Sequence, residues 1–147
     1  MTTLTKEELL RELAAAEREH PTTRIRMPSD VVPMLARYSR RRQECFLAVS
    51  LDGAHQVIRT REITRGLANR TMVHAREVFR GAIRDNAVAL ILAHNHPSGS
   101  VEPSDEDKSI TRALTSAGDV IGIPVLDHVI ISRTGYYSFL ENDELRS

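Results

Sequence analysis

An apolar run that leads directly into two histidines constrains this chain more than any other feature. Residues 87–93, Ala-Val-Ala-Leu-Ile-Leu-Ala, carry no charge and are typical of a buried strand. His94 and His96 follow at once, and residues two apart on an extended chain point to the same side. We therefore expect both imidazoles to leave the end of a buried strand on one face, with Asn95 pointing the other way.

A carboxylate follows at a position from which it can join the two histidines. Asp107 lies eleven residues after His96, one turn into the next helical pattern, and can reach back toward them. Two imidazoles and a carboxylate are three protein ligands, and a catalytic zinc site has three such ligands with a water in the fourth position. The spacing predicts that His94, His96 and Asp107 hold a metal ion, with Zn²⁺ as the expected cofactor.

A metal-activated water needs a group that takes its proton, usually a carboxylate that does not bind the metal. Spacing alone leaves five candidates open: Glu44, Glu62, Glu77, Glu102 and Glu106. Glu44 has a slight advantage, because it begins an apolar strand where a plain surface residue would be unusual. Ser104 could stabilise a developing oxyanion. Ser104 and Asp107 also fit a helix-capping box, and the two interpretations are compatible.

Composition favours one globular domain of 147 residues, 41% hydrophobic and 27% charged. No apolar run approaches the roughly 20 residues that span a bilayer, and residues 1–8 lack the pattern of a secretory signal. The single cysteine, Cys45, excludes an internal disulfide and is compatible with a reducing compartment. We expect a cytoplasmic protein with no membrane partner.

Helical and strand patterns alternate along the rest of the chain. Helices are expected at about 5–18, 31–38, 74–84 and 104–117, the last of them capped by Gly118. Strands are expected at about 44–51, 56–63, 87–93, 124–132 and 136–140, the first two as a hairpin. This order predicts an α/β fold, a mixed β-sheet flanked by helices. The apolar stripe of the first helix must pack on the domain or on a second subunit, so an oligomer is possible.

The residues of the predicted site resemble the JAMM motif of MPN-type zinc metalloproteases. The match is His94-Asn-His96-Pro97, six residues, Ser104, two residues, Asp107. The wider stretch resembles the RadC-like branch of that family, through 93–99, 103–107 and 123–128, extended by 73–79 and 136–139. The resemblance covers about Arg42 to Leu140, and divides the chain into an N-terminal helical extension, 1–40, and a RadC-like domain, 41–147.

The resemblance implies a fold, a site and a reaction. The implied fold is JAMM/MPN metalloprotease-like, which is also cytidine-deaminase-like. The implied site is a zinc ion held by His94, His96 and Asp107, with Glu44 as the general base and Ser104 near the oxyanion. The implied reaction is hydrolysis of a peptide or isopeptide bond in an unknown peptide or protein substrate.

Alternatives to this interpretation come from other residues. A DNA-associated, repair-related or scaffold module with a non-catalytic metal is possible, supported by a basic cluster at Arg37, Arg40, Arg41 and Arg42. The formal net charge of zero favours a solvated surface there instead. Hydrolytic deamination is set aside, because the His-x-Glu and Pro-Cys-x-x-Cys ligands of zinc deaminases are absent.

Three further side chains receive structural interpretations. Asp127 and His128 are adjacent on a predicted strand and so point to opposite faces. One is expected to be buried near the metal loop and the other to face solvent. Cys45 points away from Glu44, and we expect its thiol to pack in the core.

Overall fold

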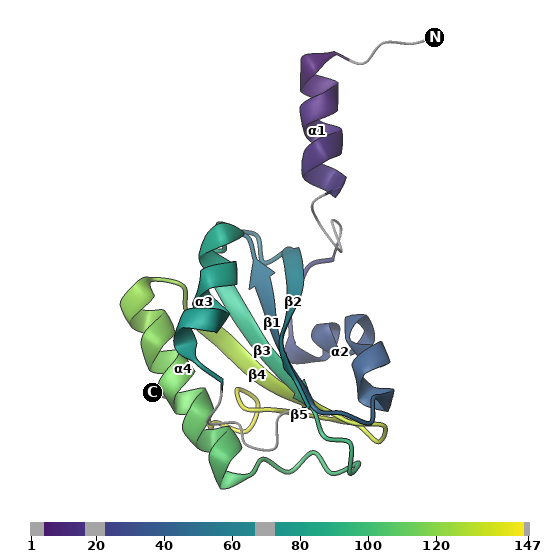
Figure 1. The fold of residues 1–147 in the computed structure, drawn as a ribbon, viewed down its shortest axis with the longest axis vertical. Coiled ribbons are helices and arrows are strands. Elements are labelled where there is room, and N and C mark those ends of the chain that lie inside the picture. The colour runs from purple at the N-terminus through teal and green to yellow at the C-terminus, as the bar shows by residue number, and fades with distance from the viewer. Residues whose placement is uncertain (1–4, 17–22, 67–72, 146–147) are drawn as a thin grey trace.

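The computed structural model describes residues 5–16, 23–66 and 73–145, and its centre is a five-stranded mixed sheet (Figure 1). The strands lie in the order β2-β1-β3-β4-β5. Their bounds are β1 (Cys45–Leu51), β2 (Val57–Arg65), β3 (Ala89–Asn95), β4 (Val125–Ile131) and β5 (Tyr136–Ser138). The helices are α1 (Lys6–Ala16), α2 (Val31–Met34), α3 (Ala75–Arg84) and α4 (Asp105–Ile121), with short 3₁₀ turns at Pro28–Asp30 and Ala36–Arg40. The predicted α/β class is confirmed, and so is the hairpin of β1 and β2, which pair antiparallel.

The central strand, β3, carries the candidate site to one end of the sheet. β3 pairs antiparallel with β1, where Phe46 lies opposite His94. It pairs parallel with β4, where Ile130 lies opposite the same histidine. α4 is the crossover that a parallel pair requires. The end of β3, the start of β1 and the start of α4 therefore meet at one edge of the molecule.

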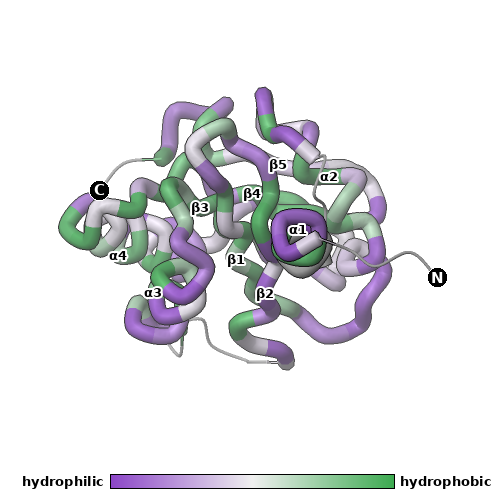
Figure 2. Tube along the Cα trace, turned by 90° about the horizontal axis from the view of Figure 1, so that it is seen from above, coloured by the Kyte–Doolittle hydropathy of each residue, from purple (hydrophilic) through white to green (hydrophobic). Residues whose placement is uncertain are grey.

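The sheet is covered on both faces, which gives two apolar cores. α3 and α4 lie on one face (Figure 1), and Phe79 and Leu114 pack there with Leu92 of β3. The segment before β1 covers the other face, where Leu35 packs with Ile91 of β3. Hydrophobic residues follow the central strands when the molecule is seen from above (Figure 2). Alternate residues of β3 thus enter opposite cores, as the period of two for a strand requires.

The helix ends differ from those expected in two places. α4 continues to Ile121, and its C-cap is Gly122, whose φ of 89° is left-handed. The predicted end at Gly118 is wrong: Gly118 lies inside the helix, where a Cβ would stand 2.6 Å from the carbonyl oxygen of Ile123. The predicted helix at 31–38 is also interrupted, because Leu35 leaves the helical region at φ −105° and ψ 12°.

The N-terminal segment contains two different parts. α1 begins with the predicted capping box, in which Thr5 and Glu8 each bond the other's backbone N–H. It stands clear of the sheet (Figure 1), with Leu9 48% and Leu10 56% exposed. Ile25, in contrast, belongs to the core. The division at residue 40 stays a prediction. None of the described helices has the length and apolarity needed to cross a bilayer.

Candidate metal centre

The three predicted metal ligands meet at the C-terminal end of β3. His94 lies near the end of that strand, His96 follows it, and Asp107 is in the first turn of α4. The Nε2 atoms of the two histidines are 3.0 Å apart. Oδ1 of Asp107 lies 3.3 Å from Nε2 of His94, and Oδ2 lies 3.2 Å from Nε2 of His96. The structure brings together all three residues that the spacing selected.

A backbone carbonyl orients the ring of His96. Nδ1 of His96 lies 3.0 Å from the carbonyl oxygen of Ser100. Because that oxygen can only accept a hydrogen bond, we assign the ring proton of His96 to Nδ1. Nε2 then carries a lone pair directed at Nε2 of His94 and at the Asp107 carboxylate. Such a convergence of electron-rich atoms calls for a positive charge among them, and two imidazoles with a carboxylate are a donor set that fits zinc.

Asp107 is held in place by the start of its own helix. Its side chain is fully buried, and burial alone would raise its pKa. The pKa of Asp107 is nevertheless lowered, because the N–H of Ser104 and positive charge at the imidazoles, or on a cation held between them, all favour the carboxylate. Its Oδ2 accepts the N–H of Ser104 at 2.9 Å, and its own N–H donates to Oγ of Ser104 at 3.0 Å. The predicted capping box is confirmed, and it aims the carboxylate at the histidines.

Glu44 lies at the mouth of the centre. It immediately precedes β1, and its Oε1 is 3.7 Å from Nε2 of His96. Glu44, His96 and Ser104 line an open hollow, which we call the site hollow. The side chains of His94 and Asp107 are fully buried. Solvent therefore reaches the centre past Glu44 and His96.

The other four candidate bases lie in different surroundings. Glu102 also lines the site hollow. Glu62 is paired with an arginine of its own strand, and Glu77 lines a separate groove. Glu106 is exposed in the first turn of α4. Geometry therefore favours Glu44, followed by Glu102.

The residue between the two histidines holds the backbone on both sides of Glu44. Asn95 is fully buried. Its Oδ1 accepts the N–H of Cys45 at 2.6 Å, and its Nδ2 donates to the carbonyl of Gln43 at 3.0 Å. Asn95 thus points away from the imidazoles, as expected. One tripeptide supplies two candidate ligands and fixes the position of the candidate base.

Glu44 also comes close enough to be considered as a ligand itself. One possible ligand atom from each of Glu44, His94 and His96 lies within 4.8 Å of the others. Asp107, however, approaches both imidazole nitrogens, at 3.3 and 3.2 Å, more closely than Glu44 approaches His96, at 3.7 Å. The distances favour Asp107 as the third ligand and Glu44 as its neighbour.

The expectation that Asp127 or His128 faces solvent is wrong. Both are buried, with exposed fractions of 2% and 0%. His128 lies behind the centre, with its Nε2 2.7 Å from Nδ1 of His94. Asp127 accepts hydrogen bonds from the Ser138 hydroxyl and from the N–H of Leu140. Hydrogen bonds from the C-terminal turn therefore satisfy the Asp127 carboxylate inside the protein.

His128 is the neighbour of the centre to which sequence reasoning assigned no role. Its place behind His94 depends on the parallel pairing of β3 with β4, in which Leu92 lies opposite His128. Strands 30 or more residues apart carry no local signal of their register. The sequence signals were an Asp–His pair within a strand that is otherwise apolar, and the resemblance of residues 123–128 to the RadC-like branch.

Cys45 and two of the clustered arginines have structural surroundings. The Cys45 thiol is buried in the core, as predicted, and burial raises its pKa. The guanidinium groups of Arg37 and Arg41 stack over the ring of Tyr38, at 4.9 and 4.8 Å from its centroid. Binding of nucleic acid by this cluster stays a prediction.

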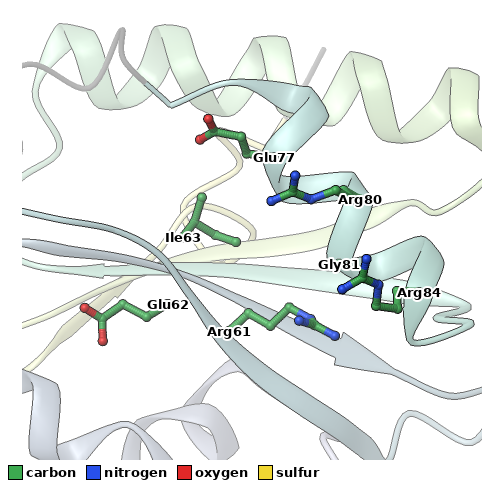
Figure 3. A pocket seen from close by; sticks show the side chains of 7 residues that line it. All are labelled: Arg61, Glu62, Ile63, Glu77, Arg80, Gly81 and Arg84. Carbon is green, nitrogen blue, oxygen red and sulfur yellow. The ribbon is translucent and has the colours of Figure 1, made fainter.

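A second groove lies between β2 and α3 (Figure 3). Its lining is almost wholly charged: Arg61, Glu62, Glu77, Arg80 and Arg84, with Ile63 and Gly81. Arg61 is held by Asp85 through hydrogen bonds of 3.0 and 2.6 Å. Glu62, Glu77 and Asp85 equal the three arginines in number. The lining includes none of the candidate metal ligands.

Comparison with known proteins gives the same family as the motif. A model described as RadC-like JAB domain matches residues 25–145. Similar curated relatives are UPF0758 proteins of Methanospirillum hungatei (54% identity over 95 residues), Trichlorobacter lovleyi (48% over 101) and Thermotoga maritima (47% over 103). The alignments cover 65%, 69% and 70% of this chain. They cover only 42%, 44% and 46% of the relatives, so the chain spans less than half the length of the proteins it matches.

Proposed function

The chain belongs to the RadC-like JAB domain family, and on that premise we propose that it is a zinc-dependent metallohydrolase that cleaves a peptide or isopeptide bond. One observation carries the proposal. His94, His96 and Asp107 direct their donor atoms at one another within 3.0 to 3.3 Å, while Glu44 stands 3.7 Å from His96 at the edge of the site hollow.

The proposed chemistry divides between the ion and the chain. A bound zinc ion supplies a Lewis acid that polarises a carbonyl and makes a water more acidic. Glu44 accepts the proton of the attacking water and returns it to the leaving nitrogen. Its carboxylate is 20% exposed, so it can meet both water and substrate. The contacts of Asn95 with the neighbouring backbone hold Glu44 at this position.

Ser104 is proposed to donate a hydrogen bond to the developing oxyanion. Its Oγ accepts the N–H of Asp107 at 3.0 Å, which leaves its own proton available for another acceptor. Ser104 also lines the site hollow with Glu44 and His96. A hydroxyl at this place can stabilise negative charge on a substrate that occupies the hollow.

Elemental analysis of the purified chain tests the metal first. We expect about one zinc per chain in the wild type, as a three-ligand site requires, and its loss in His96→Ala. Glu44→Gln separates the two possible roles of Glu44. If Glu44 is the base, this variant keeps the zinc and loses hydrolysis of peptide and isopeptide probes. If Glu44 is a ligand, the variant loses zinc as well.

The opposite outcomes are equally clear. A wild-type chain that takes up no metal when zinc is offered would overturn the proposal. A chain that keeps zinc without hydrolysing any probe, and that binds DNA in a salt-dependent manner weakened by changing residues 40–42, would favour the DNA-associated or scaffold function instead.

A further inference from the structure

Two buried side chains behind His94 form a hydrogen-bonded chain that ends on a backbone carbonyl. Nδ1 of His94 lies 2.7 Å from Nε2 of His128. Nδ1 of His128 is hydrogen-bonded to Oγ1 of Thr111 in α4. The same hydroxyl lies 2.6 Å from the carbonyl oxygen of Asp107. All three side chains in this chain of contacts belong to fully buried residues.

We propose that His128 and Thr111 are positioning residues, which fix the ring proton of His94 on Nδ1 and so present a bare Nε2 to the metal centre. The proposal rests on the function proposed above for its metal, but the orientation of the ring is a property of the chain itself. Metal-binding histidines commonly donate their second N–H to a carboxylate or a carbonyl. Here a second imidazole takes that place.

The direction of the chain of hydrogen bonds follows from its last member. A carbonyl oxygen cannot donate, so the Thr111 hydroxyl must give its proton to Asp107. The Thr111 oxygen then acts as the acceptor for Nδ1–H of His128. With its single proton on Nδ1, the His128 ring has a lone pair on Nε2, which accepts Nδ1–H of His94. The Asp107 carbonyl therefore sets the direction of the Thr111 hydroxyl. That hydroxyl sets the tautomer of His128, and His128 sets the tautomer of His94.

The planes of the rings are fixed by aromatic neighbours. Phe139 stacks on the His128 ring at a centroid distance of 4.9 Å, and Phe46 meets its edge at 5.5 Å. Phe46 also stacks on His94, at 6.0 Å. The rings are therefore held in the orientation in which the two nitrogens meet.

The result is a matched pair of imidazoles. His96 donates directly to the carbonyl of Ser100, while His94 reaches the carbonyl of Asp107 through two side chains. In both rings Nε2 is unprotonated, and the two Nε2 atoms face each other at 3.0 Å. The indirect route also ties β3 and β4 to α4, which carries the third candidate ligand.

The hydroxyl of Thr111 gives the sharpest test, because Thr111→Val removes it with little change of shape. In this variant we expect zinc affinity, measured by competition with a chromophoric chelator, to fall about 10- to 100-fold. Thr111→Ser keeps the hydroxyl and should bind zinc nearly as the wild type does. Thr115→Val is the matched control, because the Thr115 hydroxyl donates to the carbonyl of Thr111, at 2.7 Å, and has no other bond among the described residues.

A second readout is independent of metal. In ¹⁵N-labelled, metal-free wild type, long-range ¹H–¹⁵N spectra of the imidazoles should show the proton of His94 on Nδ1. The Nε2–H form of His94 would overturn the proposal, and so would equal zinc affinity in folded Thr111→Val and wild type. A protein with the Nδ1–H form that binds no zinc at all would refute the proposed function and leave the positioning role standing.

Discussion

Backbone groups orient the side chains of the centre. His96 is held by the carbonyl of Ser100, and Asp107 by the N–H of Ser104. Asn95 forms hydrogen bonds with the backbone of the residues on both sides of Glu44. These anchors form within the chain itself, so the proposed donor set is preorganised before any cation binds.

The two roles of Ser104 can be separated by a change that preserves the helix cap. Glycine is a nearly adequate N-cap, so Ser104→Gly should cost only a few tenths of a kcal/mol in unfolding free energy. If the hydroxyl stabilises the oxyanion, hydrolysis should fall by about 100-fold or more, with kcat affected rather than zinc content. Urea unfolding, zinc analysis and probe hydrolysis measure the three quantities. Unchanged kcat would leave Ser104 as a cap alone.

Asp127 should make the stability of the protein depend on pH. Burial raises its pKa above the ordinary value, and hydrogen bonds from Ser138 and Leu140 oppose this rise without cancelling it. A carboxyl with a raised pKa binds its proton more tightly in the folded state. The unfolding free energy therefore falls as pH rises from the ordinary pKa through the raised one.

Asp127→Asn should remove that contribution. Urea unfolding of both proteins between about pH 4 and pH 7 would then show the variant gaining on the wild type as pH rises. Parallel profiles for the two proteins would show that this carboxyl does not titrate differently in the folded state.

At the scale of elements, the alternation of residues in a strand predicted side-chain directions better than glycine predicted the end of a helix. The run 87–93 and the alternation of His94, Asn95 and His96 predicted a buried strand and the shared face of the two imidazoles, because a strand offers only two faces. The strand itself runs from Ala89 to Asn95, two residues later than expected at both ends. The end of α4 was misplaced, because a glycine in a helix can mark a cap or a close contact. Only the approach of Gly118 to the carbonyl of Ile123 distinguishes them.

Three glycines give a matched set of variants: Gly118 inside α4, Gly122 at its C-cap and Gly135 between β4 and β5. Gly122→Ala should cost roughly 1–2 kcal/mol in unfolding free energy, because its φ is left-handed. Gly118→Ala should also destabilise, by roughly 1–3 kcal/mol of steric strain less about 1 kcal/mol of helix propensity. Gly135→Ala is the control, since a Cβ there meets nothing within 4 Å. Urea midpoints would rank them, and a neutral Gly122→Ala would contradict the cap.

At the scale of the whole molecule, the order of elements predicted a mixed sheet, but register and coverage came only from the structure. Nothing in the sequence places Leu92 opposite His128, or turns the C-terminal segment onto Asp127. Spacing alone also left five glutamates as candidate bases, and only distance to His96 separated them. Local pattern fixes which face a side chain takes, while contacts between distant segments decide what it meets there.

Truncation tests where the folded unit begins. Deleting residues 1–21 removes α1, whose described side chains are all exposed, and should change the unfolding free energy by less than about 1 kcal/mol. Deleting residues 1–26 also removes Ile25, 7% exposed, and its hydrogen bond to His55. That deletion should cost more than about 2 kcal/mol. Equal urea midpoints for the two deletions would show that Ile25 adds nothing to the core.

The buried position of Cys45 makes it a kinetic probe of the proposed centre. It is the only cysteine of the chain, its thiol is sealed in the core, and the residue before it is Glu44. A thiol reagent can reach it only when the start of β1 separates from its neighbours, so the labelling rate reports how often that segment opens. A cation that joins β3 to α4 should slow this opening. A lower labelling rate of Cys45 would then report metal binding before any substrate is known.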